Sequence, residues 1–249
     1  MLDVQAIEHA TLAAVPPRLA EECQGWLVAL DPGTVGRAHS AAPLHHGAPS
    51  PGSVHAVEAL YAREGLPPVF RLPAVPAFDG LRTQLAAAGY RGAKPTLVQL
   101  AAVHDAAPGT REVRIDAWPD AGWEEVFLGE GFDPVDGACR LALLRRSRDA
   151  VFARIVRNGR TVAVGAACFS QGWCGLHGMR TAPTARRGGC ASAIVAALLR
   201  EARSRGIAQA FLQVEQGNAA AQSVYRRFGF ETAWGYDYWK RPPRLLGRA

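Results

Sequence analysis

One stretch in the second half of the chain constrains the fold most strongly. Two β-rich runs, 151–156 and 161–169, flank Asn158-Gly159, and Asn-Gly between such runs is the strongest short signal for a hairpin. A third β-rich run, 173–181, follows directly. Strands joined by such short turns are antiparallel, so the sequence argues against the parallel βαβ unit of dinucleotide-binding proteins.

Helices and strands alternate after this stretch. Apolar residues recur at helical spacing from Ala191 to Ala202 and stop before Gly206, as expected for an amphipathic helix with a glycine stop. Asn218 can cap a shorter helix that ends at Gly229. The pattern predicts a helix at 138–146, the three strands, the amphipathic helix, a strand at 209–214, the capped helix and a strand at 230–239.

The first half of the chain contains a faint copy of this ending. Residues 56–72 and 81–91 repeat the order helix, strand, helix, Gly-aromatic. Two glycine pairs, Gly65 with Gly206 and Gly89 with Gly229, are offset by 141 and 140 residues. We therefore predict a duplication, with an N-terminal domain at 1–107 and a C-terminal domain at 108–249 that meet near Pro108 in a turn-rich segment.

Length and composition bound the class of protein. The 249 residues are 49% hydrophobic and 20% charged, as in globular proteins of one large or two small domains. Apolar runs such as 191–199 are about half the ~18 residues that a membrane span needs. Asp3 and Glu8 precede any basic residue, unlike in a signal peptide. We expect a cytoplasmic protein without a membrane partner.

Cysteine and charge add two expectations. Five cysteines without a C-x-x-C pair indicate reduced thiols and no metal site. The net charge of +6 and the pI near 9.4 are compatible with nucleic acid, with an anionic cofactor, or with no particular partner. Because the basic residues are mostly dispersed, we expect solvated surface rather than nucleic-acid binding, with one exception.

That exception is 186-RRGGCA-191, between the third strand and the amphipathic helix. Gly188 and Gly189 let a backbone approach a ligand closely, and the helix start presents free N–H groups with the positive end of its dipole. Arg186 and Arg187 add charge, so the loop suits a pyrophosphate. It does not match the P-loop, because no Lys follows the glycines.

Two motifs on these elements resemble those of the GNAT superfamily of acyl-CoA-dependent N-acetyltransferases. The pattern R/Q-x-x-G-x-G/A matches Arg186, Gly189 and Ala191, and N-x-x-A-x-x-x-Y-x-x-x-G-F matches Asn218, Ala221, Tyr225, Gly229 and Phe230. The resemblance covers about residues 111–239. It implies a mixed α/β (α+β) tandem GNAT-like fold, with a mostly antiparallel twisted sheet flanked by helices in each half.

The resemblance also implies acetyl-CoA as co-substrate, with direct transfer of its acetyl group to a primary amine in a ternary complex. The backbone from Arg187 to Ala191 would hold the CoA pyrophosphate, and Met179 to Thr181 would pair with pantetheine. The expected cofactor-binding residues are Met179, Arg180, Thr181, Arg186, Arg187, Gly188, Gly189, Cys190, Ala191, Asn218, Ala221 and Tyr225.

Catalytic roles follow from the same resemblance. Tyr225 would be the general acid for the departing thiolate, since its phenol pKa of ~10 lies in a similar range; by spacing alone it is a core residue. His177 and Glu215 are candidate general bases, each open to a structural interpretation, and water can relay the proton instead. Gly175 stands where related enzymes often carry a carboxylate. Cys190 we interpret as a space-filler rather than a nucleophile.

Several alternatives remain open at this point. A CoA-binding sensor or pseudoenzyme would keep the loop but not transfer acetyl. The N-terminal copy lacks the Arg-x-x-Gly-x-Gly/Ala pattern, so we expect a scaffold or lid. The acceptor can be a small molecule or a peptide amine, and a terminal strand rich in Trp and Tyr could pair across a homodimer. Trp118, Trp123, Trp173, Trp234 and Trp239 fit a core better than a cleft lining.

Overall fold

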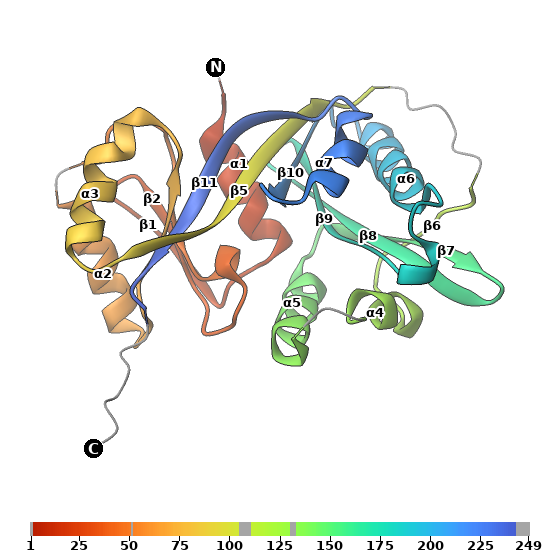
Figure 1. Cartoon of the computed structure of the whole chain (residues 1–249), viewed down its shortest axis with the longest axis horizontal. Coiled ribbons are helices and arrows are strands. Elements are labelled where there is room, and N and C mark those ends of the chain that lie inside the picture. Colours follow the sequence, from red (N-terminus) through yellow and green to blue (C-terminus); the bar gives the residue numbers. More distant parts are fainter. Residues whose placement is uncertain (1, 51, 105–110, 130–132, 243–249) are drawn as a thin grey trace.

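A single sheet of eleven strands runs through the whole molecule. The structure is a computed structural model that describes residues 2–50, 52–104, 111–129 and 133–242. The strand order is β1-β2-β3-β4-β11-β5-β10-β9-β8-β7-β6 (Figure 1). The strands are β1 Leu19–Cys23, β2 Trp26–Leu30, β3 Ala41–Pro43, β4 Val69–Pro73, β5 Arg91–Ala102, β6 Arg114–Asp116, β7 Ala150–Arg157, β8 Arg160–Ser170, β9 Trp173–Thr181, β10 Gln209–Glu215 and β11 Glu231–Lys240.

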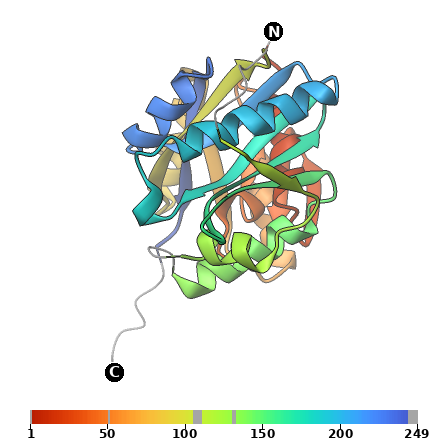
Figure 2. The same cartoon turned by 90° about the vertical axis from the view of Figure 1, so that its right-hand side faces the viewer.

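Helices cover both faces of this sheet. The α-helices are α1 Val4–Ala14, α2 Ser53–Arg63, α3 Asp79–Ala87, α4 Ala121–Phe127, α5 Pro134–Arg146, α6 Cys190–Ser204 and α7 Ala219–Arg226, and short 3-10 turns are η1 Gly36–Ala38, η2 Pro76–Phe78 and η3 Pro183–Ala185. In the C-terminal half, α6 and α7 lie on one face and α4 and α5 on the other (Figure 2).

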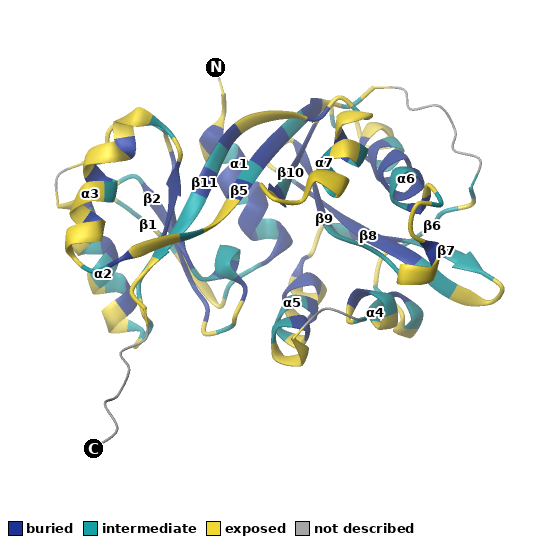
Figure 3. Ribbon diagram, in the orientation of Figure 1, coloured by how far each residue is buried: buried dark blue, intermediate teal, exposed yellow. Residues whose placement is uncertain are grey.

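The alternation of side chains along β7 explains this layering. Val151, Ala153 and Ile155 pack in the core beneath α6, whereas Phe152 packs with Trp123 of α4 on the opposite face. Successive side chains of a strand point to opposite faces, so one strand contributes to two cores. Buried residues, drawn dark blue, also occupy most of strands β8 to β10 (Figure 3).

The two halves have matching topologies and exchange a strand. Both parallel strand pairs, β3 with β4 and β9 with β10, are bridged by a helix, α2 or α6. The strand that ends each half then pairs antiparallel with the other half: β5 lies beside β10, and β11 lies beside β4. β5 and β11 also pair with each other at the centre of the sheet. This arrangement supports the predicted duplication, which stays a prediction.

The predicted elements of the C-terminal half are confirmed. Asn158 and Gly159 turn the chain between β7 and β8 with φ of 50° and 74°, the left-handed conformation that a two-residue hairpin requires. Asn218 caps α7 by accepting a hydrogen bond from the Ala221 amide at 3.1 Å. The mixed α/β fold with a mostly antiparallel sheet flanked by helices is also confirmed, with the sheets of the two halves joined into one.

Three other expectations concern the domain boundary, the pairing of the last strand and the absence of a membrane span. Pro108 and the predicted boundary between 107 and 108 lie outside the described residues, and the division into domains stays a prediction. Strand β11 is not an edge, because it lies between β4 and β5; the suggested pairing of this strand across a homodimer is therefore wrong, while the homodimer itself stays a prediction. Among the described residues, no helix has the length and apolarity needed to cross a bilayer.

Candidate functional site

Strands β9 and β10 separate in the middle of the C-terminal half. Their parallel pairing runs from Trp173 opposite Gln209 to Leu176 opposite Leu212. Beyond these residues β9 continues to Thr181, paired with β8 only. A pocket of about 1010 Å³ lies at this opening, lined by His177 to Thr181, the loop before α6, the start of α6, and α7. We call it the main pocket.

The glycine loop forms one wall of the main pocket. Gly189 precedes α6 with a φ of 75°, and Arg187 has a φ of 60°, so two left-handed residues turn the backbone sharply before the helix. A Cβ on Gly188 would lie 3.2 Å from the Ala185 carbonyl oxygen. The absence of a side chain at Gly188 therefore keeps open the space that the N–H groups at the start of α6 face.

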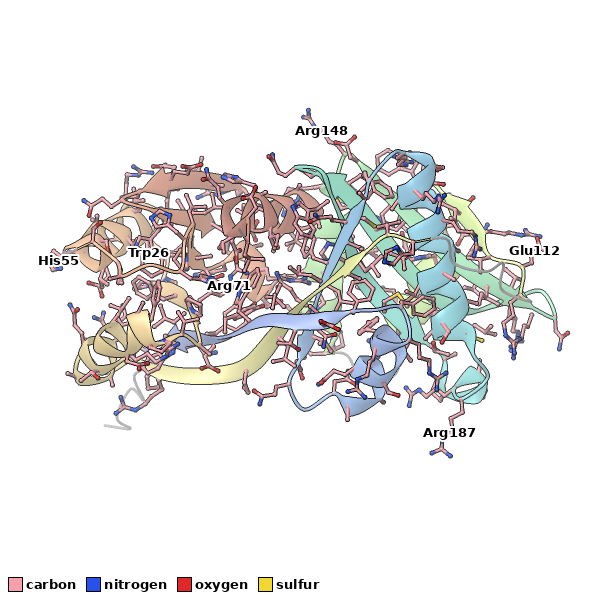
Figure 4. The ribbon with its side chains drawn as sticks, turned by 90° about the horizontal axis from the view of Figure 1, so that it is seen from above. Trp26, His55, Arg71, Glu112, Arg148 and Arg187 are labelled. Atoms are coloured by element: carbon pink, nitrogen blue, oxygen red, sulfur yellow. The ribbon has the colours of Figure 1, made fainter. Side chains whose placement is uncertain are left out.

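Guanidinium groups surround this loop. Arg180, Arg186, Arg187 and Arg227 line the main pocket, and the Arg187 side chain extends outward from the molecule (Figure 4). Burial and the neighbouring charges of Arg186 and Arg140 lower the pKa of Arg180. Several guanidiniums on one wall are suited to bind phosphate groups.

Arg157 is a member of this cluster that the sequence did not reveal. It ends β7, and its Nη2 donates to Cys190 Sγ at 3.4 Å. A Cβ on Gly188 would lie 3.7 Å from the same nitrogen. The hairpin thus brings a cation to the glycine loop from 33 residues upstream. No motif marks Arg157, because only the β7–β8 pairing and the packing of α6 on these strands place it there.

Most of the predicted cofactor residues meet in the main pocket. Those that line it are Met179, Arg180, Thr181, Arg186, Arg187, Gly189, Cys190, Ala191, Asn218 and Ala221. Gly188 and Tyr225 are not among the lining residues. Gly188 nonetheless belongs to the loop that forms the wall, and Tyr225 follows the lining residue Val224 on α7. Binding itself stays a prediction for all twelve.

Tyr225 lies at the border between the main pocket and the core. Its ring contacts Phe230 edge-on, with centroids 6.0 Å apart, and packs in the core beneath α6. Burial raises the pKa of its phenol to about 12. The hydroxyl therefore keeps its proton at neutral pH, as a general acid must. The catalytic role of Tyr225 stays a prediction.

His177 lines the main pocket with both ring nitrogens enclosed. Arg37 Nη1 lies 3.2 Å from His177 Nδ1, and since a guanidinium can only donate, Nδ1 accepts. The proton of the neutral ring is then on Nε2, which is buried without a partner. Burial and the Arg37 charge hold the pKa of His177 well below its ordinary value. This geometry disfavours proton abstraction by His177, whose role as a base stays a prediction.

The His177 ring occupies space that a side chain at position 175 would fill, and Gly175 has none. A Cβ at this position would lie 2.6 Å from His177 Nε2 and 2.7 Å from the Phe211 ring. Gly178 follows with a φ of 60° at a register shift between β8 and β9, a β-bulge that redirects the strand. The position where related enzymes often carry a carboxylate is thus filled by the His177 ring.

The remaining candidate residues are not placed to take part in catalysis. Glu215 is exposed at the end of β10 and does not line it, so its role as a base also stays a prediction. Cys190 is buried at the start of α6, in keeping with a space-filler. Trp123, Trp173 and Trp234 are buried in core clusters, whereas Trp118 is 64% exposed. The described residues contain no group of three or more potential metal ligands.

The N-terminal half contributes residues that the sequence did not indicate. Val15, Val35 and Arg37 line the main pocket beside β9. Arg140 of α5 does so as well, and its guanidinium pairs with Asp136 at 2.7 Å. The contact between Arg37 and His177 spans 140 residues. No local pattern can predict such a contact, because it depends on how η1 meets β9 across the joined halves.

Comparison with known proteins places this site in a family. Residues 2–239 match the family described as "Probable histone acetyltransferase Rv0428c C-terminal". A GCN5-related N-acetyltransferase from Kribbella flavida superposes with a TM-score of 0.71 at 19% identity, covering 99% of this chain and 98% of that one. A tandem GNAT protein from the clavulanic acid biosynthesis pathway gives 0.60 at 15% identity, covering 95% and 94%. At these identities the structures show the fold.

A curated relative adds a local match. A segment of 50 residues is 50% identical to mycothiol acetyltransferase from Saccharomonospora viridis, and it covers 20% of this chain and 16% of that protein. The match thus spans about a sixth of the relative's length and says nothing of the rest. The family match over residues 2–239 and the shared fold identify the chain as a GNAT-type acetyltransferase of the Rv0428c C-terminal family.

Proposed function

We propose that this protein transfers an acetyl group from acetyl-CoA directly to a primary amine in a ternary complex. The observation that carries the proposal is the main pocket, where the parted strands β9 and β10 lead to an arginine-flanked glycine loop at the start of α6. When bound, acetyl-CoA would supply an activated acetyl thioester. The comparisons support an acetyltransferase of GNAT type, and the donor and the acceptor are the proposal.

The residues of the main pocket fit a pyrophosphate followed by an extended chain. The N–H groups of Arg187 to Ala191 would hold the pyrophosphate, with Arg157, Arg180 and Arg186 as counter-charges. Past Leu176, the edge of β9 that faces β10 is free of strand pairing. Met179 to Thr181 would therefore bond pantetheine amides as an added strand. No metal ligand is needed for this chemistry.

We assign the proton transfer to the thiolate to Tyr225 and the proton transfer from the amine to water. Tyr225 would give its proton to the departing sulfur, since its phenol is protonated at neutral pH. His177 offers no free lone pair to the acceptor, and Glu215 is outside the pocket. In this proposal the proton of the attacking amine therefore leaves through pocket water, and His177 serves to hold Arg37.

Calorimetry with acetyl-CoA tests the first half of the proposal. Wild-type protein should bind, and Gly189→Glu should abolish binding by placing bulk and negative charge in the loop. Gly206→Glu is the matched control, because Gly206 has a similar φ of 73° at the other end of α6 with open space around it. Absence of acetyl-CoA binding by the wild type would overturn the proposal.

A thiol-release screen tests the second half. Small amines, amino acids and peptides are each offered with acetyl-CoA, and release of free CoA thiol is recorded. Release with one class identifies the acceptor; binding of acetyl-CoA without release from any class would instead support a sensor. A cytoplasmic location without a nucleic-acid partner is part of the proposal, and tight, steeply salt-dependent binding to duplex DNA, which requires several phosphate contacts, would contradict it.

A further inference from the structure

Arg37 enters the main pocket from the N-terminal half. It lies in η1, and its loop approaches β11 so closely that a Cβ on Gly36 would be 2.7 Å from the Tyr238 ring. Only a glycine at position 36 leaves room for this approach. The backbone contact and the hydrogen bond to His177 fix the guanidinium at the pocket wall from two sides.

Arg37 also differs from the arginines around it because those arginines form ion pairs with carboxylates. Arg71 pairs with Glu8 in the interior, Arg140 with Asp136, and Arg146 with Asp31. The polar groups that act on Arg37 are the phenols of Tyr236 and Tyr238, the guanidiniums of Arg140 and Arg71, and His177. Within the described part of the chain, no carboxylate neutralises it.

Such an arrangement is costly without a ligand. Burial lowers the pKa of Arg37, which means that its charged form loses hydration that no internal anion replaces. His177 accepts one of its N–H groups through Nδ1. Since a guanidinium carries five donors in a planar fork, others remain to face the pocket, in the geometry that suits carboxylate or phosphate oxygens.

In the proposed binding mode, the phosphates of acetyl-CoA lie away from Arg37. The contact of Arg37 is His177, and the glycine loop begins only after Thr181, four residues further along β9. At about 3.3 Å per residue, this separation is about 13 Å along the strand. Arg37 therefore lines the main pocket away from the glycine loop, on the side that the proposed binding of acetyl-CoA leaves for an acceptor.

We infer that Arg37 binds an anionic oxygen group of the acceptor, so that the substrate class is amines that also carry a carboxylate or a phosphate. This inference rests on the proposed function. Arg37 is a specificity residue here: it binds and orients the acceptor and takes no part in proton transfer. His177 is a positioning residue that directs the guanidinium, and Gly36 is the residue that admits its loop.

Matched pairs of amines test this inference. Thiol release is compared for amino acids against their uncharged amides, and for phosphoethanolamine against ethanolamine. The anionic member of one pair should react at least about tenfold better in kcat/KM, as expected when a buried donor loses its partner. The pair that shows the preference distinguishes carboxylate from phosphate.

Variants assign that preference to Arg37. Arg37→Gln should raise the acceptor KM about tenfold or more, leave kcat changed far less, and abolish the preference, while acetyl-CoA affinity stays the same. Arg37→Lys should restore part of it. Arg18→Gln is the control, because Arg18 forms an exposed ion pair with Glu64 at 2.7 Å outside the pocket lining.

A binding measurement separates this inference from the proposed function. Acetate and inorganic phosphate are titrated into the protein saturated with CoA, and one of them should bind to wild type and not to Arg37→Gln. Anion binding that depends on Arg37, without thiol release from any amine, would overturn the proposed function and retain the anion site. Equal turnover of charged and neutral amines, or equal anion binding by both proteins, would overturn the anion site.

Discussion

The Nη2 atom of Arg157 lies 3.4 Å from Cys190 Sγ, so that the end of a hairpin strand contacts the first residue of α6. This contact joins the end of β7, which carries no family motif, to the glycine loop before α6, which does. It places a guanidinium behind the glycine loop, where the charge can stabilise a bound pyrophosphate and the contact can hold the loop in shape.

Replacing this guanidinium should weaken acetyl-CoA binding. We expect Arg157→Gln to raise the dissociation constant about 3- to 10-fold, the effect of losing one partly solvated charged contact. Calorimetry measures it, with Arg160→Gln as control because Arg160 is exposed across the same turn. Equal affinities of wild type and Arg157→Gln would show that the cation does not reach the ligand.

Removing the Tyr225 hydroxyl should affect turnover and leave binding intact. A general acid contributes about 100-fold or more, so Tyr225→Phe should lower kcat for thiol release by that order. Acetyl-CoA affinity should change little, because the ring and its contact with Phe230 remain. A kcat equal to that of wild type would remove Tyr225 from the mechanism, and a wild type without turnover would favour the sensor.

The enclosed imidazole of His177 should make the fold sensitive to acid. Its pKa in the folded protein is well below the ordinary value. Below about pH 6.5, His177 therefore binds a proton in the unfolded chain but stays neutral in the folded protein. The contribution of the neutral ring to the free energy of unfolding is fully present above that pH and is lost as the pH falls. The free energy of unfolding falls by up to about 1.4 kcal/mol for each pH unit below this value, as long as the folded ring stays neutral.

Urea unfolding at pH 7 and pH 5 measures this effect. The difference between the two pH values should be smaller for His177→Gln than for wild type, whatever the variant does to stability at pH 7. The same loss in both proteins would contradict the assignment. If His177 were the base, the variant would also lose the acidic limb of the pH–rate profile, which we do not expect.

The exchange of β5 and β11 predicts how a truncated chain behaves. In residues 108–249 alone, β10 would lose its antiparallel partner β5, and β11 would lose both neighbours. Unpaired central strands expose backbone donors and apolar faces. The fragment should therefore aggregate or lack a cooperative thermal transition, as seen by calorimetry and light scattering. A monomeric, cooperatively folded fragment would instead support two independent domains.

Local chemistry was enough to predict the C-terminal elements from α5 onward, whereas β6 and α4 were not predicted. Asn158-Gly159 needs left-handed φ values that few other pairs adopt, Asn218 has the side chain of a helix cap, and Gly189 allows the turn before α6. These signals act within a few residues, so the sequence alone identifies the hairpin, the helices and the loop. The family motifs lie on the same elements for the same reason.

The tertiary structure decided everything that depends on distant residues. Pairing of β11 with β4 and β5 is set by which edges are open after both halves form, and a strand's own pattern does not name its partner. Likewise, His177 is recognisable as a candidate from the sequence, but only packing against Phe211 and Gly175 encloses its Nε2, and only the joined sheet brings Arg37 to its Nδ1. The sequence by itself determined the loop and the class of fold, whereas the part of the pocket that we propose for the acceptor depends on a contact between Arg37 and His177, 140 positions apart.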